Sequence, residues 1–223
     1  MNNIQMNQTA RIGGITLIAG ATVMFIGAGF YFSTGIDLWG ALATNTIADY
    51  LVATAAVQTQ LITNLTLWII GILLLGMGGA QLVTLGKERP ALARMARVCL
   101  TTGVPLAILS FIAMLSVVVQ LGGDGSETAV VLAKTVGWIG TRTDDLATAL
   151  IVGIAPLFIA LAAKKAWMPN WLFYWAIAAF IIGVISLVGI YLPALADIGF
   201  LIVPVGLGWM IATGVTLLRL SPA

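Results

Sequence analysis

Long apolar runs separated by short polar segments dominate this chain. Six of the runs reach or approach the roughly 20 helical residues that a hydrocarbon core of about 30 Å requires. We expect membrane-spanning helices at about residues 12–32, 57–85, 98–121, 146–163, 171–192 and 198–218. The pattern predicts an all-α fold in which residues 1–223 form one bundle of six transmembrane helices.

The polar segments between the runs are expected to be loops. Residues 33–50 form the first, and residues 122–145 form the longest. Within the longest loop, residues 127–138 could form a short helix lying on the membrane surface. The second apolar run begins near Leu51, earlier than a bilayer requires, so its start is expected to project from the membrane or its helix to tilt.

The basic residues fall almost entirely on one side of the predicted bundle. Short cytoplasmic loops of membrane proteins carry an excess of Lys and Arg. Six spans put both chain ends on the same side, so we expect cytoplasmic N and C termini. The basic residues on that side are Arg11, Lys87, Arg89, Arg94, Arg97, Lys164, Lys165 and Arg219, against Lys134 and Arg142 on the other. The acids expected on the other side are Asp37, Asp49, Asp124, Glu127, Asp144, Asp145 and Asp197.

Composition supports a membrane location. Hydrophobic residues make up 61% of the chain and charged residues 8%, whereas about 25% of the residues of a soluble domain are charged. The net charge of +2 is too small to indicate a nucleic acid as partner. The expected partners are the lipid bilayer and other membrane proteins, or a second copy of the chain.

The residue types that are missing narrow the chemistry. The sequence has no His and a single Cys, which excludes histidine-ligated metal or haem, imidazole-based catalysis and an intrachain disulfide. We find no phosphate-binding loop, zinc-protease or nucleophile-elbow motif. We therefore predict no catalytic residue, no metal site and no cofactor.

Two amides in the second run are the first candidate site. Gln60 and Asn64 are four residues apart and share one helical face. Amides in hydrocarbon need hydrogen-bond partners, so this face should point into the bundle. It makes hydrogen bonds between helices, belongs to a helix end that emerges into water, or lines an outward-open polar cavity.

The second candidate is the charged group Arg142, Asp144 and Asp145, at the predicted outer end of the fourth span. These acids would suit a helix N-terminus, where they would cap backbone N–H groups and pair locally with the arginine. The alternative is a site for a cation or a basic partner. No ionisable residue falls in the middle of any predicted span, which argues against a proton-coupled pump.

Prolines and small residues mark further packing features. Kinks are expected at Pro105, Pro156 and Pro204 within the third, fourth and sixth spans. Small residues four positions apart permit helices to approach closely. These pairs are Ala149 with Gly153, Ala179 with Gly183, and Gly208 with Ala212.

Two short segments resemble a known family. Residues 9–15 (TARIGGI) and 168–172 (MPNWL), followed by Gly183, are similar to a bacterial six-helix membrane family catalogued as domain of unknown function 4386. The resemblance implies a multi-pass protein of the bacterial inner (cytoplasmic) membrane and transfers no catalytic residue. Family members often carry a charged residue in the second span, where this chain has Gln60 and Asn64.

These observations lead to a non-enzymatic interpretation. We expect an accessory or structural subunit of a membrane complex, or a homo-oligomer, that acts through helix contacts. The alternative is a channel or carrier for a small neutral or lipophilic solute, using the Gln60 and Asn64 face. An enzyme acting on lipid through Asp144 and Asp145 is less favoured, because such a site needs further convergent groups.

Overall fold

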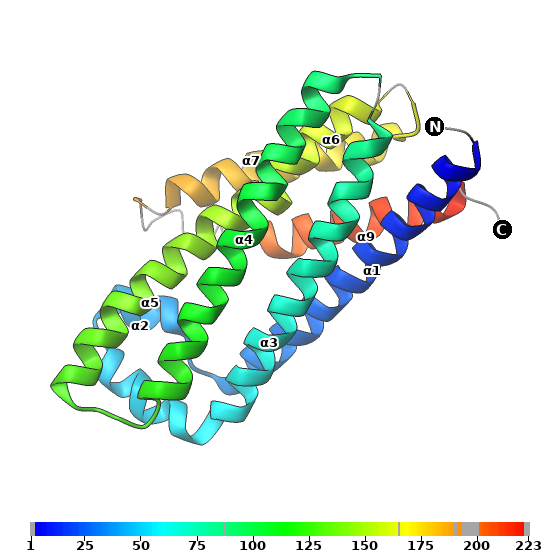
Figure 1. Cartoon of the computed structure of the whole chain (residues 1–223). Helices are drawn as coiled ribbons and strands as arrows, with labels where there is room; N and C mark the ends of the chain where they lie inside the picture. Colours follow the sequence, from blue (N-terminus) through cyan, green and yellow to red (C-terminus); the bar gives the residue numbers. More distant parts are fainter. Residues whose placement is uncertain (1–2, 87, 165, 190, 193–200, 221–223) are drawn as a thin grey trace.

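The computed structural model describes the chain except residues 1–2, 87, 165, 190, 193–200 and 221–223, and it shows no strand within the described residues. The chain is a bundle of helices (Figure 1). The α-helices are α1 (Asn3–Thr34), α2 (Leu38–Thr44), α3 (Ile47–Leu85), α4 (Pro90–Leu121), α5 (Glu127–Thr148), α6 (Ala155–Ala163), α7 (Asn170–Gly189) and α9 (Ile202–Leu220), and η1 (Ala149–Ile154) is a π-helix.

In the described part of the chain, six helices are long and apolar enough to cross a membrane, which confirms the all-α, six-span prediction. They are α1, α3, α4, the continuous helix made by α5, η1 and α6, then α7 and α9. The beginning of the sixth predicted span, residues 198–200, lies outside the described residues, as do Lys87, Lys165 and Asp197.

The predicted loop over residues 122–145 is wrong. Its polar part is short, and a helix begins at Glu127, capped by the Ser126 hydroxyl, which accepts a hydrogen bond from the Ala129 N–H. The helix continues without a break through η1 to Ala163, so the fourth span has 37 residues rather than the predicted 146–163. It does not lie alone on a surface, because α5 packs along α4.

Small residues explain why so polar a segment joins the bundle. The buried positions of α5 are occupied by alanine, glycine and threonine, so its backbone can approach α4 without large side chains. They are Ala129, Ala133, Gly137, Gly140, Thr141 and Ala147. A hydropathy pattern does not detect such a face, because these residues are only weakly apolar.

The predicted loop over residues 33–50 also contains helix. The Asp37 carboxylate accepts hydrogen bonds from the N–H groups of Trp39 and Gly40 and so caps α2. Asn45 then adopts a left-handed conformation that ends α2, and α3 begins at Ile47, ten positions before the predicted start of the second span.

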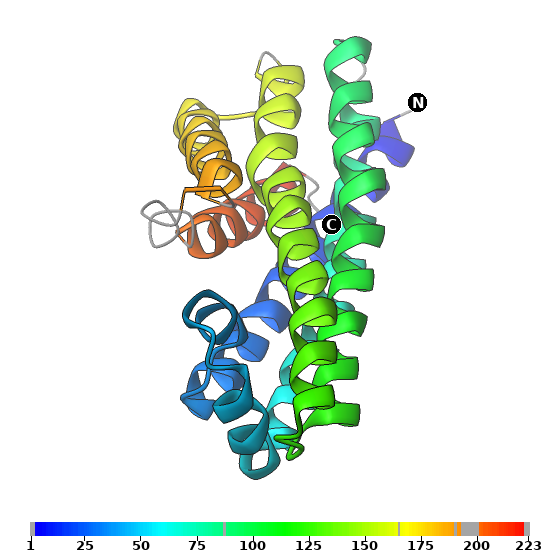
Figure 2. The same ribbon diagram turned by 90° about the vertical axis from the view of Figure 1, so that its left-hand side faces the viewer.

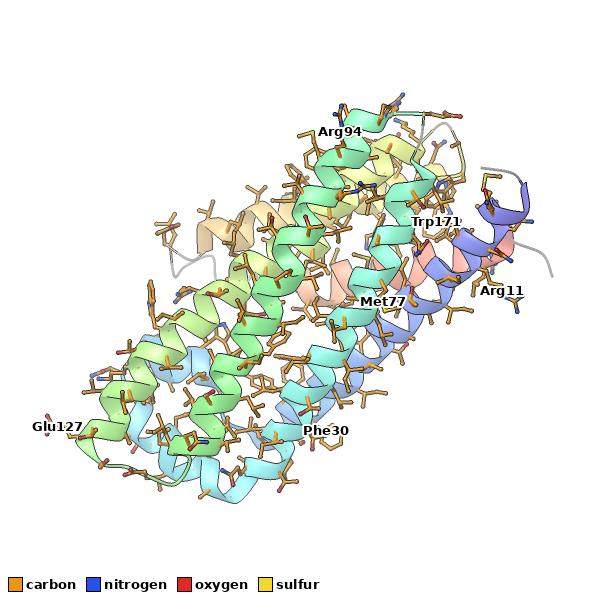
Figure 3. All side chains as sticks on the ribbon, in the orientation of Figure 1. Arg11, Phe30, Met77, Arg94, Glu127 and Trp171 are labelled. Atoms are coloured by element: carbon orange, nitrogen blue, oxygen red, sulfur yellow. The ribbon has the colours of Figure 1, made fainter. Side chains whose placement is uncertain are left out.

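Charge separates along the bundle. Both termini lie at one end, together with Arg11, Arg94 and Trp171, and Glu127 lies at the other (Figures 1 and 3). We name these the basic end and the acidic end. The α4–α5 loop at the acidic end holds Asp124, whose carboxylate accepts a hydrogen bond of 2.8 Å from the Ser126 N–H, and this bond keeps the pKa of Asp124 below its ordinary value. Which end faces the cytoplasm stays a prediction.

Pairs of glycines bring helices into backbone contact. A methyl group built on Gly153 of η1 would lie 2.9 Å from the Gly183 Cα of α7, and the reverse distance is also 2.9 Å. A methyl group built on Gly14 of α1 would likewise lie 2.8 Å from the Gly214 carbonyl oxygen of α9, and one built on Gly214 would lie 2.7 Å from the Gly14 carbonyl oxygen. The predicted close approach at Gly153 and Gly183 is therefore confirmed.

The prolines have different roles. Pro105 lies inside α4, and Pro156 lies in the first turn of α6, directly after η1. The predicted kink at Pro204 is wrong, because α9 begins at Ile202 and a proline in the first turn of a helix removes no helical hydrogen bond.

Enlarging Gly153 should separate η1 from α7. We expect Gly153→Ala to lower the free energy of unfolding by about 1–3 kcal/mol, because backbone rather than a flexible side chain occupies the space. Gly29→Ala is the matched control, since Gly29 of α1 has nothing within 4 Å of an added methyl group. It should leave stability unchanged or raise it by up to about 1 kcal/mol, because alanine favours helix. Thermal unfolding in detergent compares the two variants, and equal effects would contradict the contact.

Candidate functional site

Asp144 lies near the midpoint of the continuous helix Glu127–Ala163. One turn before it, Gly140 packs against α4 so closely that an added methyl group would lie 3.1 Å from Met114 and 3.3 Å from the Ser110 carbonyl oxygen. Ser110 is in the middle of the apolar stretch of α4, well away from both ends of that helix. The carboxyl group is thus deep in the bundle.

The surroundings of the Asp144 carboxyl are only partly polar. The hydroxyls of Ser110, on α4, and Thr148, one turn along the same helix, lie beside it. Ser110 is buried and donates its own hydrogen bond of 3.0 Å to the Ala107 carbonyl. The Oδ1 atom of Asp144 is buried and has no hydrogen-bond partner among the described residues. The site therefore holds a polar oxygen that nothing described in the chain satisfies.

The neighbouring acid is paired. Asp145 accepts a hydrogen bond of 2.9 Å from Arg142, with which it forms an ion pair whose side chains are 22% and 32% exposed. Trp39 of α2 also lies against the Asp145 carboxylate. The local ion pair expected from the sequence is present, and it leaves Asp144 without a cationic partner among the described residues.

The expected capping role is wrong for this group. The helix N-terminus is 16 or more residues away at Ser126 and Glu127, so Asp144 and Asp145 do not face free N–H groups. The statement that no span contains an ionisable residue near its middle is wrong for the same reason. Both errors follow from starting the fourth span at residue 146, where hydropathy rises, rather than at residue 127.

A π-helix begins five residues after Asp144. In η1 the N–H of Ala155 bonds to the carbonyl of Leu150, which is five residues back rather than four. Pro156 has no N–H for the carbonyl of Val152, and α9 approaches this carbonyl with Gly206, where an added methyl group would lie 2.7 Å from the oxygen. Single π-turns are frequent at functional sites.

The two amides of the first candidate site behave differently. Asn64 is 1% exposed and donates a hydrogen bond of 2.9 Å to the Gly27 carbonyl of α1. Gln60 is half-buried and makes no side-chain hydrogen bond within the described residues, whereas Gln58 donates one of 2.9 Å to the Val118 carbonyl of α4. The interhelical hydrogen bond expected for this face is confirmed for Asn64. Gln58 makes a second interhelical hydrogen bond, which the sequence did not indicate.

Asn64 also lines a small cavity with aromatic walls. The cavity has a volume of about 20 Å³, enough for one water-sized molecule. Its aromatic lining consists of Tyr31, Trp39, Tyr50 and Trp68. We define these four rings and Asn64 as the aromatic cavity.

Hydrogen bonds of its aromatic side chains connect the aromatic cavity with residues of the acidic end and with α1. The Tyr31 hydroxyl donates a hydrogen bond to the Asp37 carboxylate, and the Trp68 Nε1–H donates one of 3.1 Å to the Met24 carbonyl. Trp39 lines the cavity and also lies against Asp145, so it connects this cavity with the charged group. The sequence does not reveal this cavity, because nothing in a sequence shows that Tyr31, Trp39 and Tyr50 converge.

The Asp144 site has the groups needed to bind a proton. A carboxyl group with hydroxyl neighbours can take up and release a proton. Within the described ranges, no group of three or more His, Cys, Asp or Glu side chains could hold a metal ion.

Comparisons with family models, curated proteins and solved structures find no match to this chain. The resemblance to domain of unknown function 4386 therefore stays a prediction.

Proposed function

We propose that this protein is a multi-pass membrane protein without enzymatic activity, whose helix packing responds to proton binding at Asp144. We further propose that it transmits this response through contacts with other membrane proteins or with a second copy of itself. The observation that carries the proposal is the buried, unpartnered Oδ1 atom of Asp144 near the midpoint of a transmembrane helix. Ionisable groups at such positions are usually functional.

The free energy of burying charge indicates which form of Asp144 the bundle accommodates. A buried carboxylate needs donors for its oxygens, and a neutral carboxyl needs fewer. The charged neighbour of Asp144 is Asp145, which repels a second negative charge, and the nearby Arg142 pairs with Asp145 instead. Ser110 and Thr148 supply hydroxyls only. These surroundings support a protonated Asp144 in the packed state.

The position of Asp144 gives its protonation a way to affect packing. The residue lies between the close contact at Gly140 and the π-helix whose Gly153 touches α7. A charge appearing there would draw in water or a cation and disturb both contacts. Helices α4 and α7 are thus the elements whose positions we expect to change.

The cavity supports contact rather than transport as the mode of action. The aromatic cavity has room for one water-sized molecule, which leaves little space for a carried solute. The outside of the bundle presents large apolar side chains suited to lipid or to helices of a partner, such as Ile26, Leu73, Leu109 and Ile181. We propose the bacterial inner membrane as its location, in line with the family resemblance and the charge pattern.

Replacing Asp144 with its neutral isostere tests the protonation state. Asp144→Asn should raise the free energy of unfolding near neutral pH, because the wild-type carboxyl group is neutral in the folded bundle but ionises in the unfolded chain, whereas the amide stays neutral in both. Asp145→Asn should cost about 1–3 kcal/mol, because it leaves Arg142 without its charged partner. As pH rises from about 4, the ordinary pKa of an aspartate in an unfolded chain, to about 7, wild-type stability should fall because only the folded state keeps the Asp144 proton, and Asp144→Asn should lose this dependence. Thermal unfolding in detergent across this range measures it, and an identical pH profile in both proteins would contradict the proposal.

Native mass spectrometry tests the contact function. The protein is extracted gently from its own membrane at two pH values, and its companions or copy number are determined. We expect wild type to change its partners or oligomeric state with pH and Asp144→Asn to keep the low-pH state. Asp49→Asn is the matched control, since Asp49 is an exposed acid at the start of α3, and it should behave as wild type. A lone monomer at both pH values would refute the contact function.

A further inference from the structure

A surface groove lies at the acidic end between the end of α2 and the first half of α5. Its volume is about 500 Å³, and its lining residues are Leu42, Asn45, Lys134, Thr135, Trp138 and Ile139. Figure 2 shows α2 and the end of α1 beside the acidic half of the long helices, while α7 and α9 flank the basic half. The groove is separate from Asp144 and from the aromatic cavity.

The polar side chains that line the groove offer hydrogen-bond donors and include no carboxylate. Lys134 is half-buried and forms no ion pair within the described residues. The Asn45 side chain is exposed and makes no hydrogen bond to the described part of the chain. No Asp or Glu is among the lining residues. An ammonium and an amide with free donors, in a lining without carboxylates, complement an anion that has several acceptor oxygens.

The rest of the groove is apolar and open. Trp138 is 56% exposed and Ile139 is 54% exposed, and Leu42 contributes a further aliphatic wall. Val131 and Leu132, on the same helix, are also exposed. A tryptophan beside a lysine is typical of the level where hydrocarbon meets headgroups.

We propose that this groove binds one anionic phospholipid, with its phosphate at Lys134 and Asn45 and an acyl chain along Trp138 and Ile139. The position of Lys134 supports this assignment. The acids Asp37, Asp49, Asp124 and Glu127 repel anions there, so an anionic lipid bound at that end requires a local cation. Among the described residues of the acidic end, Lys134 is the cation outside the Arg142–Asp145 pair.

Binding of phosphatidylglycerol is compared by native mass spectrometry in wild type, Lys134→Gln and the matched control Lys164→Gln. Lys164 belongs to the basic end, where its ammonium lies 3.9 Å from the centre of the Phe173 ring. We expect Lys134→Gln to weaken the tightest lipid-binding event about fivefold, the effect of one lysine near a membrane surface. Lys164→Gln should leave that event unchanged, and Trp138→Ala should weaken it.

Two competing ligands test whether the groove recognises an anionic lipid, rather than any lipid or any soluble phosphate. Phosphatidylcholine should bind several-fold more weakly than phosphatidylglycerol, and soluble glycerol phosphate should not displace it, since it lacks the acyl chain. The proposal is overturned if Lys134→Gln binds as wild type does, if Lys164→Gln loses as much, or if either competing ligand matches phosphatidylglycerol. Unchanged thermal unfolding of Lys134→Gln shows that the fold is retained.

Discussion

Backbone contact between helices at glycines is the constraint on which the rest of this bundle depends. Gly153 meets Gly183, and Gly14 meets Gly214, at distances that leave no room for a methyl group. Lipid supplies no hydrophobic driving force between helices, so close packing and interhelical hydrogen bonds must hold them together. Both devices meet at Gly27, whose carbonyl accepts the Asn64 hydrogen bond and where an added methyl group would lie 2.7 Å from the Trp68 ring.

The same close packing explains the proposed role of Asp144. At Gly140 the long helix lies against α4 so tightly that the carboxyl group one turn later faces Ser110 rather than water. The π-helix then carries the chain past Pro156, while α9 reaches the Val152 carbonyl through Gly206. A carboxyl group with one buried oxygen that has no partner among the described residues lies next to a helix segment of irregular hydrogen bonding, so its protonation state and the packing depend on each other.

The sequence predicted the six spans because long apolar runs leave few alternatives in a membrane. It failed at residues 127–145, where α5 buries alanine and glycine instead of large apolar side chains and carries Arg142 and Asp145 as an internal pair. Asn64 was identifiable as an inward-facing amide, because an amide in hydrocarbon needs a partner. Its partner, Gly27, could not be identified from the sequence, because the order of the helices and their relative heights in the membrane are properties of the assembled bundle. Trp39 was missed for the same reason.

The buried position of Asp144 depends on α5 running along α4, and a cysteine pair tests this arrangement most directly. A methyl group built on Gly140 lies 3.4 Å from the Ala113 Cβ, close to the separation of disulfide-bonded residues. In a Cys99→Ala background, Gly140→Cys with Ala113→Cys is oxidised in native membranes, and protection of both thiols from alkylation is measured by mass spectrometry. The structure predicts ready disulfide formation for this pair and none for Ala113→Cys with Gly29→Cys. Free thiols at residues 113 and 140 after oxidation would contradict the placement of α5 and, with it, the buried position of Asp144.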